Sequence, residues 1–421
     1  MRRLTPDARR YLLFMALLTA GLSLYSLFFN LLLLALGYNQ QLLPLPFLGE
    51  LSLLGLLNST PVLTSALSSL PLWMLVSRWG PRPALIAATL LTAITLLGTA
   101  VWPAPLSMLV WIALSGPAGV LYQVGSAPFM LRHSSPEDRD LLFSLSAGLT
   151  IIVGGVSSLV GGQLPALLGP LLNVAPQSAA LYRVIFGIAA LFALLALLPL
   201  LRAEAPRAVN DPPATVAVSS ALNHTALFRA VRIALPFMIS PLFISCGASL
   251  FIPFLNLYFR QQFAASDGAL GLIFALISFA TGAATLATPL LAQRMGKMGS
   301  VVLSQLLGIP CLLLLVIAPN LWSAALIAVA RGALMNMATP LYDAFTMERT
   351  PEAARPIVIG LIGAAFSVGY IVGPTVSVEI QRTYGFGPIF LVTAAFYACA
   401  ALANYLIFVH PERRGRLSSL V

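Results

Sequence analysis

The chain carries one short pattern twice, as Leu75–Arg82 with the sequence LVSRWGPR and as Leu291–Lys297 with the sequence LAQRMGK. Each copy contains Arg-x-Gly followed closely by another basic residue, and the second copy lies 216 residues after the first. A second pair of short motifs, Pro136–Arg139 and Pro351–Arg355, recurs at an offset of 215 residues. Matches that keep their order at an almost constant offset predict that the chain consists of two related halves.

A third match pairs Asn30 with Asn256, at an offset of 226 residues. The larger offset means that the first half has gained about ten residues between this asparagine and the Arg-x-Gly pattern. We expect the insertion near residues 40–50. Asn58, three residues before Pro61, is interpreted as part of a helix irregularity rather than a site.

The composition indicates a protein that spans a membrane several times. Of the 421 residues, 59% are apolar and only 9% are charged, against about 25% charged residues in an ordinary soluble domain. The 23 basic and 13 acidic residues cannot cover a soluble globule of this length with a polar shell. The same composition excludes collagen-like, coiled-coil and disordered classes.

Twelve segments are long and apolar enough to cross about 30 Å of hydrocarbon as helices. We therefore expect an all-α, polytopic membrane protein. The polar stretch 202–230 is predicted to be a cytoplasmic linker between an N-terminal six-helix bundle (1–201) and a C-terminal six-helix bundle with a short tail (231–421). The expected spans are 11–36, 51–77, 84–102, 106–131, 142–168, 179–201, 231–259, 269–292, 300–318, 322–346, 357–381 and 388–409.

The basic residues predict the orientation of the chain. All but four of the 23 fall in the terminal segments, the linker and the loops after the second, fourth, eighth and tenth spans. By the positive-inside rule, both termini are expected in the cytoplasm of a multi-pass protein of the plasma (cell inner) membrane. The first span is expected to stay uncleaved. The net charge of +10 thus reflects the orientation of the chain in the membrane, and no nucleic-acid partner is expected. The four remaining basic residues are Arg183, Arg260, Arg331 and Arg382.

The repeated pattern resembles the signature of the major facilitator superfamily, Gly-x-Leu-Ala-Asp-Arg-x-Gly-Arg-Arg, after the second and eighth spans. The resemblance covers nearly the whole chain and implies two parallel six-helix bundles with a central cavity lined by spans 1, 4, 7 and 10. The chain departs from the signature at the aspartate, which is Ser77 in one copy and Gln293 in the other. In the family this aspartate helps to lock the cytoplasmic side, so Glu348 is the carboxylate left to pair with Arg294. The residues expected to act in coupling or gating are Asp343, Arg78, Arg82, Arg294, Lys297 and Glu348.

Arg331 is the strongest candidate for a substrate contact. It lies nine residues into the tenth span, and its counterpart in the first half is Gly116. A charge near the bilayer centre costs at least about 2.5 kcal/mol and usually marks a ligand or ion path. The alternative is that Arg331 snorkels or pairs with backbone carbonyls. Asp343 is expected to carry a coupling proton, or else to be a solvated or arginine-paired residue at the helix end. The other polar candidates, whose alternative role is interhelical hydrogen bonding, are Asn256, Asn336, Asn30, Tyr122 and Gln123.

These features predict a secondary transporter that moves a small organic solute by alternating access. The arginine favours an anion or a zwitterion, while the apolar lining suits an amphipathic compound leaving the cell. Proton coupling and facilitated diffusion both stay open. No cofactor, metal site or enzymatic activity is expected, because the sequence has no metal-ligand pair, nucleotide loop or nucleophile–base pair. We expect a monomer in the lipid bilayer. The alternative function is a non-transporting receptor or assembly protein on a transporter scaffold.

Overall fold

A computed structural model of the chain describes residues 4–45, 49–135, 137–203 and 224–410. The chain divides into two compact units. Unit 1 comprises Met1–Val216 together with Ser266–Ala275, and unit 2 comprises Ala217–Ala265 together with Leu276–Val421. Most of the predicted linker 202–230 lies outside the described ranges.

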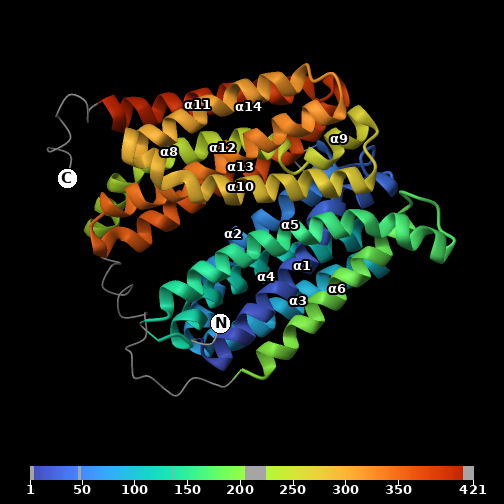
Figure 1. Cartoon of the computed structure of the whole chain (residues 1–421), viewed down its shortest axis with the longest axis horizontal. Helices are drawn as coiled ribbons and strands as arrows, with labels where there is room; N and C mark the ends of the chain where they lie inside the picture. The colour runs from blue at the N-terminus through green and yellow to red at the C-terminus, as the bar shows by residue number, and fades with distance from the viewer. Residues whose placement is uncertain (1–3, 46–48, 136, 204–223, 411–421) are drawn as a thin grey trace. The chain divides into compact units, whose positions relative to one another are not determined.

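Unit 1 is a bundle of six long helices with one hairpin (Figure 1). Its elements are α1 (Pro6–Ala35), β1 (Leu42–Leu45), β2 (Gly49–Ser52), α2 (Leu53–Trp79), α3 (Pro81–Val101), α4 (Pro105–Arg132), α5 (Arg139–Leu172) and α6 (Ala179–Leu201). The first residues of α10 also cluster with this unit.

The regular elements described in unit 2 are all helices. Its elements are α8 (His224–Phe251), α9 (Leu255–Phe263), α10 (Asp267–Met295), α11 (Lys297–Val316), α12 (Leu321–Glu348), η1 (Glu352–Ala354), α13 (Arg355–Tyr384), α14 (Gly387–Asn404) and η2 (Tyr405–Val409). Within the described part of the chain, twelve spans are long and apolar enough to cross a membrane, which confirms the predicted number.

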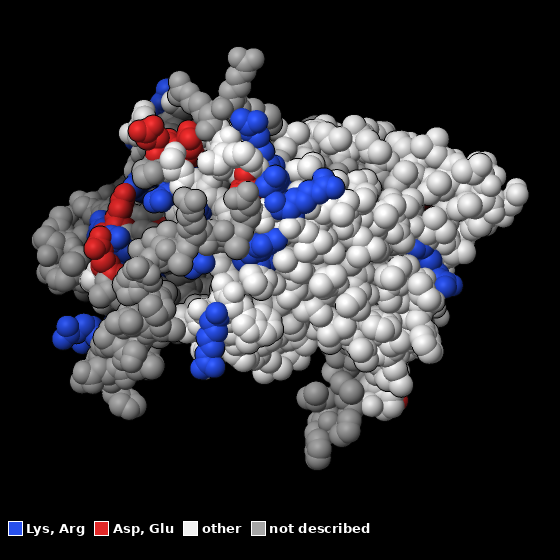
Figure 2. Space-filling view, turned by 90° about the horizontal axis from the view of Figure 1, so that it is seen from below, with Lys and Arg blue, Asp and Glu red and all other residues white. Residues whose placement is uncertain are grey.

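The surface fits a bilayer environment. Large apolar side chains are widely exposed, among them Leu171 at 76% and Leu286 at 83%. On the face drawn in Figure 2, most Lys, Arg, Asp and Glu side chains lie together, and a broad neighbouring area carries almost none. Lipid solvates such an area, whereas a soluble protein rarely exposes a large continuous apolar surface.

The same neighbour relations occur in both units. In unit 1, α1 packs on α5 and α6, and α3 packs on α4 and α6. In unit 2, α8 packs on α13 and α14, and α11 packs on α12 and α14. These pairs occupy equivalent places in the span order, as expected for related halves.

The repeated Arg-x-Gly pattern forms the same turn in both units. Gly80 separates α2 from α3 with φ 87°, and Gly296 separates α10 from α11 with φ 75°. A side chain is strained at such angles, so glycine is favoured there. The two amides also make equivalent bonds, from Gly80 to the Val76 carbonyl at 2.8 Å and from Gly296 to the Ala292 carbonyl at 2.9 Å.

A small hairpin occupies the place of the expected insertion. The strands β1 and β2 pair antiparallel, with Leu42 opposite Ser52 and Leu43 opposite Leu51. The Ser52 hydroxyl then caps α2 by accepting a bond from the Gly55 amide. The hairpin therefore leads directly into the second span.

The seventh span differs from the single continuous helix expected at 231–259. It breaks between α8 and α9 at Pro253, which has no backbone N–H and clashes with the preceding turn. The carbonyl of Leu250 loses its helical partner and instead accepts a bond from the Ser377 hydroxyl on α13. A broken helix at membrane depth needs such a replacement partner.

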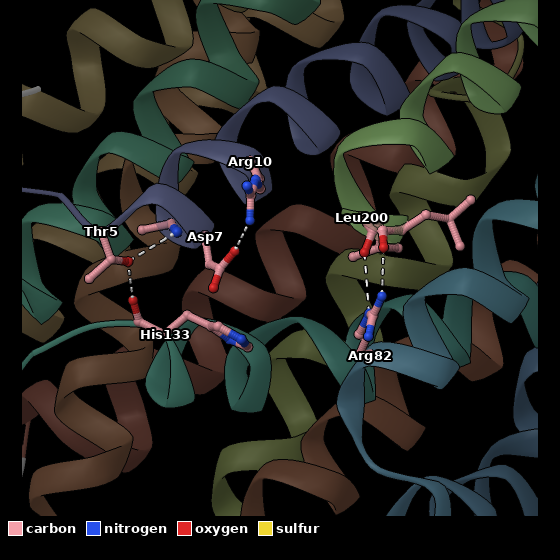
Figure 3. A network of polar contacts seen from close by, with 8 residues as sticks. Thr5, Asp7, Arg10, Arg82, His133 and Leu200 are labelled. Carbon is pink, nitrogen blue, oxygen red and sulfur yellow. Dashed lines mark hydrogen bonds and ion pairs between the residues drawn. The ribbon is translucent and has the colours of Figure 1, made fainter. Parts of the chain in front are cut away.

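The ends of α3 and α6 are capped reciprocally by two arginines. Arg82, in the first turn of α3, donates to the carbonyls of Leu200 at 3.3 Å and Leu201 at 2.7 Å at the end of α6 (Figure 3). Arg183, near the start of α6, donates to the carbonyls of Ala100 at 2.6 Å and Val101 at 3.0 Å at the end of α3. Each guanidinium thus satisfies carbonyls that have no partner within their own helix.

The start of α1 is tied to the end of α4. The Thr5 hydroxyl accepts a bond from the Ala8 amide and donates to the His133 carbonyl at 2.7 Å (Figure 3). Arg10 forms an ion pair with Asp7 at 2.7 Å, within the first turn of α1. These contacts fix the entry of the chain into unit 1.

We expect Arg183→Ala to lower the unfolding temperature of the purified protein by several degrees. The change removes two charge-assisted hydrogen bonds, each worth about 1.5–3 kcal/mol. The control is Arg382→Ala, which breaks only an exposed pair with Glu379 and is expected to cost about 1 kcal/mol or less. Equal unfolding temperatures for the two variants would contradict the capping role of Arg183.

Candidate functional site

Arg331 is buried inside unit 2. It lies on α12 with 7% of its surface exposed. Its guanidinium donates to the hydroxyl of Tyr397 on α14, and its central carbon lies 4.5 Å from the ring centre of Phe251 at the end of α8. The ring centre of Tyr397 is 5.5 Å away. A cation against two aromatic faces is stabilised by each ring quadrupole.

The charge of Arg331 is only partly compensated. No carboxylate among the described residues forms an ion pair with it, and its buried Nε atom has no hydrogen-bond partner. Buried cations are normally paired or fully hydrogen-bonded. The arrangement therefore leaves binding capacity for an anionic or acceptor group.

The two repeat-related asparagines are both buried, but their partners differ. Asn30 on α1 is 3% exposed and accepts a bond from the Asn58 side-chain amide on α2 at 2.8 Å. Asn58 also donates to the Leu54 carbonyl of its own helix. Asn256 on α9 is 2% exposed, and its side-chain oxygen accepts from the Leu257 amide at 2.9 Å. Asn58 therefore joins two helices, a role that its position before Pro61 did not predict.

The remaining predicted substrate residues are less enclosed. Tyr122 on α4 is half-buried and lines a cavity inside unit 1, whereas Gln123 beside it is exposed. Asn336 on α12 is exposed and donates to the Gly332 carbonyl one turn earlier. Asp343 is also exposed on α12. Arg331 and Asn336 thus lie on one helix, but the first faces the interior and the second does not.

The predicted gating residues show one departure from expectation. Glu348, at the end of α12, pairs with Lys297 rather than with Arg294. The pairing follows from the packing of α11 on α12, because Lys297 begins α11 at the same end of the pair where Glu348 closes α12. Arg294 and Arg78 are exposed. Arg82, in contrast, caps α6.

A buried polar cluster in unit 2 is absent from the sequence predictions. The Asn404 side-chain amide donates to Ser240 on α8 at 2.8 Å and to Gln305 on α11 at 3.2 Å, and it is fully buried. The π-helical turn η2 follows directly after Asn404. The cluster joins three helices, and the only available signal was a polar residue in each of three apolar spans.

A close contact joins α5 to the first turns of α10 within unit 1. A side chain at Gly162 would place its Cβ 2.7 Å from the Cα of Gly271. Beside this contact, the Tyr182 hydroxyl of α6 donates to the Asp267 carboxylate at 3.0 Å, and both side chains are buried. Glycine is therefore required where the two helix backbones meet.

Within the described ranges, no three His, Cys, Asp or Glu side chains come together in a group that would hold a metal ion. The described cysteines, Cys246, Cys311 and Cys399, are free.

Comparison with known proteins identifies the relatives of this chain. A profile of the Major Facilitator Superfamily matches residues 12–248 and 237–420. The multidrug resistance protein MdtG of Enterobacter lignolyticus (strain SCF1) is 27% identical over 353 residues, covering 81% of this chain and 78% of that protein. An uncharacterized MFS-type transporter, YhjO of Bacillus subtilis (strain 168), is 28% identical over 157 residues, and the match spans only 37% of each chain.

Two solved structures share the fold. The nucleoside transporter NupG, in a single-site mutant form, superposes with a TM-score of 0.73 at 17% identity, covering 96% of this chain and 100% of that one. A D-xylose–proton symporter also gives a TM-score of 0.73 at 17% identity, with coverage of 94% and 97%. At such identities the likeness establishes the architecture alone.

Proposed function

Because the chain belongs to the Major Facilitator Superfamily, we propose that it is a secondary transporter that moves a small organic solute by alternating access. The main observation in support of a substrate site is the environment of Arg331. This buried cation has an Nε atom without a hydrogen-bond partner and no carboxylate partner among the described residues. Buried ionisable groups in membrane helices mark substrate or ion paths. We therefore assign Arg331 a role in substrate binding.

The proposed substrate is an amphipathic compound with an anionic or zwitterionic group. Arg331 would receive the charged group, and the apolar side chains of the spans would receive the rest. One relative, MdtG, is named a multidrug resistance protein, which favours export over import. Asn30, Asn256 and Tyr122, together with the more exposed Gln123 and Asn336, are proposed as further contacts.

Coupling and gating are assigned to residues nearer the helix ends. The exposed carboxylate of Asp343 is proposed to carry a coupling proton. The charged groups beside the two Arg-x-Gly turns are proposed to stabilise one closed state, with the Lys297–Glu348 pair taking over the role of the missing aspartates. The group comprises Arg78, Arg82, Arg294, Lys297 and Glu348.

We further propose that the protein is a monomer in the cell inner membrane with both termini in the cytoplasm. The proposed orientation rests on the distribution of basic residues along the sequence. Its partners would be the lipid bilayer and the solute, with no nucleic acid.

Flux measurements on proteoliposomes test the transport function. We expect the fluorescent anion anilinonaphthalene sulfonate to cross faster than in protein-free liposomes. The flux is measured at matched concentrations with and without a pH gradient. A higher flux with the gradient indicates proton coupling, and equal flux indicates facilitated diffusion. Flux equal to that of protein-free liposomes, for this anion and for a zwitterionic analogue, would contradict transport.

Accessibility labelling tests alternating access. In a variant without Cys246, Cys311 and Cys399, we expect Gln123→Cys and Asn336→Cys to react with membrane-impermeant maleimides added from either side. Labelling that always occurs from one side would instead support the non-transporting receptor.

A further inference from the structure

Two arginines beside the Gly80 turn of unit 1 have no acidic partner. Arg78 lies in the last turn of α2, Arg132 is the last residue of α4, and both are exposed. A Cβ at Gly80 would lie 3.8 Å from the Nη1 atom of Arg132, so this guanidinium lies against the turn. Neither arginine forms an ion pair with a described residue. Arg82, the third arginine at the turn, already donates to carbonyls at the end of α6. The turn therefore carries uncompensated positive charge.

The equivalent turn of unit 2 has a counter-charge within the chain. Lys297, which follows Gly296, forms an ion pair with Glu348. Glu348 is the last residue of α12, just as Arg132 is the last residue of α4. These two residues are 216 positions apart, the same separation as between Gly80 and Gly296. One half of the repeat thus has a carboxylate where the other half has a guanidinium, and the turn of unit 1 is left without an internal anion.

An exposed apolar stripe on α2 leads up to Arg78. Leu67, Leu70 and Met74 precede it at intervals of three and four residues, so all four side chains lie on one face of the helix. The three apolar side chains are 73%, 66% and 48% exposed. From Leu67 to Arg78 the helix rises about 16 Å, close to half of the roughly 30 Å hydrocarbon core of a bilayer. Trp79, beside the arginine, is also exposed, and tryptophan is enriched where the hydrocarbon meets the headgroups. The stripe thus has the depth of one leaflet and ends in a charge.

Positive charge at the end of an apolar stripe matches the chemistry of an anionic phospholipid. Guanidinium groups bind phosphate oxygens through paired, charge-assisted hydrogen bonds, and basic clusters next to membrane helices attract anionic lipids. A free phosphate ion would leave the stripe uncovered. A zwitterionic lipid would bring its own cation to two arginines, and a second copy of this face would bring two further arginines. A lipid of net negative charge satisfies both parts of the surface.

We propose that the Gly80 turn of unit 1 is a docking site for one anionic phospholipid. The phosphate lies on Arg78 and Arg132, and an acyl chain follows the exposed face of α2 past Met74 towards Leu67. The lipid supplies at this turn the negative charge that Glu348 supplies at the equivalent turn of unit 2. The site lies wholly within unit 1, and binding there does not depend on the proposed transport function.

Native mass spectrometry of the purified chain, with lipid titrated into the detergent solution, tests the site. We expect dioleoyl phosphatidylglycerol to bind at least five times more tightly than dioleoyl phosphatidylcholine. Arg132→Glu places a carboxylate beside Arg78, as in unit 2, and should weaken binding of the anionic lipid at least tenfold. The matched control is Arg382→Glu near the end of α13, which changes the net charge by the same amount outside the site and should bind the lipid as the wild type does. Equal affinity for the two lipids, or equal losses in the two variants, would overturn the proposal.

Arg132→Gln is the second variant, because it removes the charge of an exposed side chain without adding a carboxylate, and it keeps the test decisive if Arg132→Glu does not fold. We expect it to weaken binding of phosphatidylglycerol at least threefold, and wild-type affinity would refute the site. Thermal unfolding separates a lipid from a free anion. The lipid should raise the unfolding temperature of the wild type more than inorganic phosphate at the same concentration does. An equal rise with phosphate, or a dimer that forms in place of the lipid-bound monomer, would show that the occupant is not a lipid.

Discussion

Arg331→Ala is expected to abolish flux in proteoliposomes while the protein still inserts into the membrane in normal amounts. The change removes the charged hydrogen bond to Tyr397 and the cation–π contact with Phe251. These interactions are worth about 1.5–3 kcal/mol and about 2 kcal/mol respectively when desolvated. The variant also removes the group proposed to bind the solute, so its effect on flux should exceed its effect on stability.

Arg331→Met separates a role in solute binding from a structural role. Methionine fills much of the same volume without a charge, and replacing a buried charge by an apolar side chain of similar size is often neutral or stabilising. We expect an unchanged or higher unfolding temperature together with lost flux. Arg382→Ala is the control, because that arginine lies in an exposed pair at the end of α13. Wild-type flux in Arg331→Met would show that the arginine has a structural role only and does not bind the solute.

The sequence was sufficient for the span count and the turn positions, but not for the side-chain partners. Hydropathy averaged over a window of about 20 residues identifies an apolar helix, and a charged residue such as Arg331 that falls within that window is then expected inside the membrane. It carries no information on the rotation of the helix about its axis. The contacts of Arg331 with Tyr397 and Phe251 depend on that rotation, and so does the enclosure of Asn404.

Charged residues at helix ends show the same limit. From the sequence, Arg82 is predicted to act in gating and Arg183 is assigned no role, yet in the structure each caps the neighbouring antiparallel helix. The choice of Lys297 over Arg294 as the partner of Glu348 likewise follows from which helix ends adjoin. The break at Pro253 is different, because the proline was visible in the sequence, but the apolar run around it outweighed the signal.

A second large effect is expected for Gly271→Leu, at the contact between α5 and α10. A Cβ at this position would lie 2.5 Å from the Ser158 carbonyl oxygen and 2.7 Å from the Cα of Gly162. Both obstacles are backbone atoms, so no rotamer change relieves the clash and the helices must move apart. Forced overpacking costs about 1–3 kcal/mol or more, and we expect the unfolding temperature to fall by several degrees.

The separation should also break the bond between Tyr182 and Asp267, because Asp267 lies one turn before Gly271 on α10. Alternating access, as proposed, requires helices to part and close again in each cycle. A leucine that holds α5 and α10 apart is expected to reduce flux at least tenfold. Tyr182→Phe, which removes only the hydrogen bond, should have a smaller effect on both flux and stability.

The matched control for this contact is Gly148→Leu on α5, where a Cβ meets nothing within 4 Å. It introduces the same side chain into the helix that opposes Gly271, but without a clash. We expect wild-type flux and an unfolding temperature close to that of the wild type, since Gly148 is only half-buried and a Cβ there would meet no neighbouring atom. Equal losses in Gly148→Leu and Gly271→Leu would show that bulk on these helices, rather than the close backbone contact, governs the outcome.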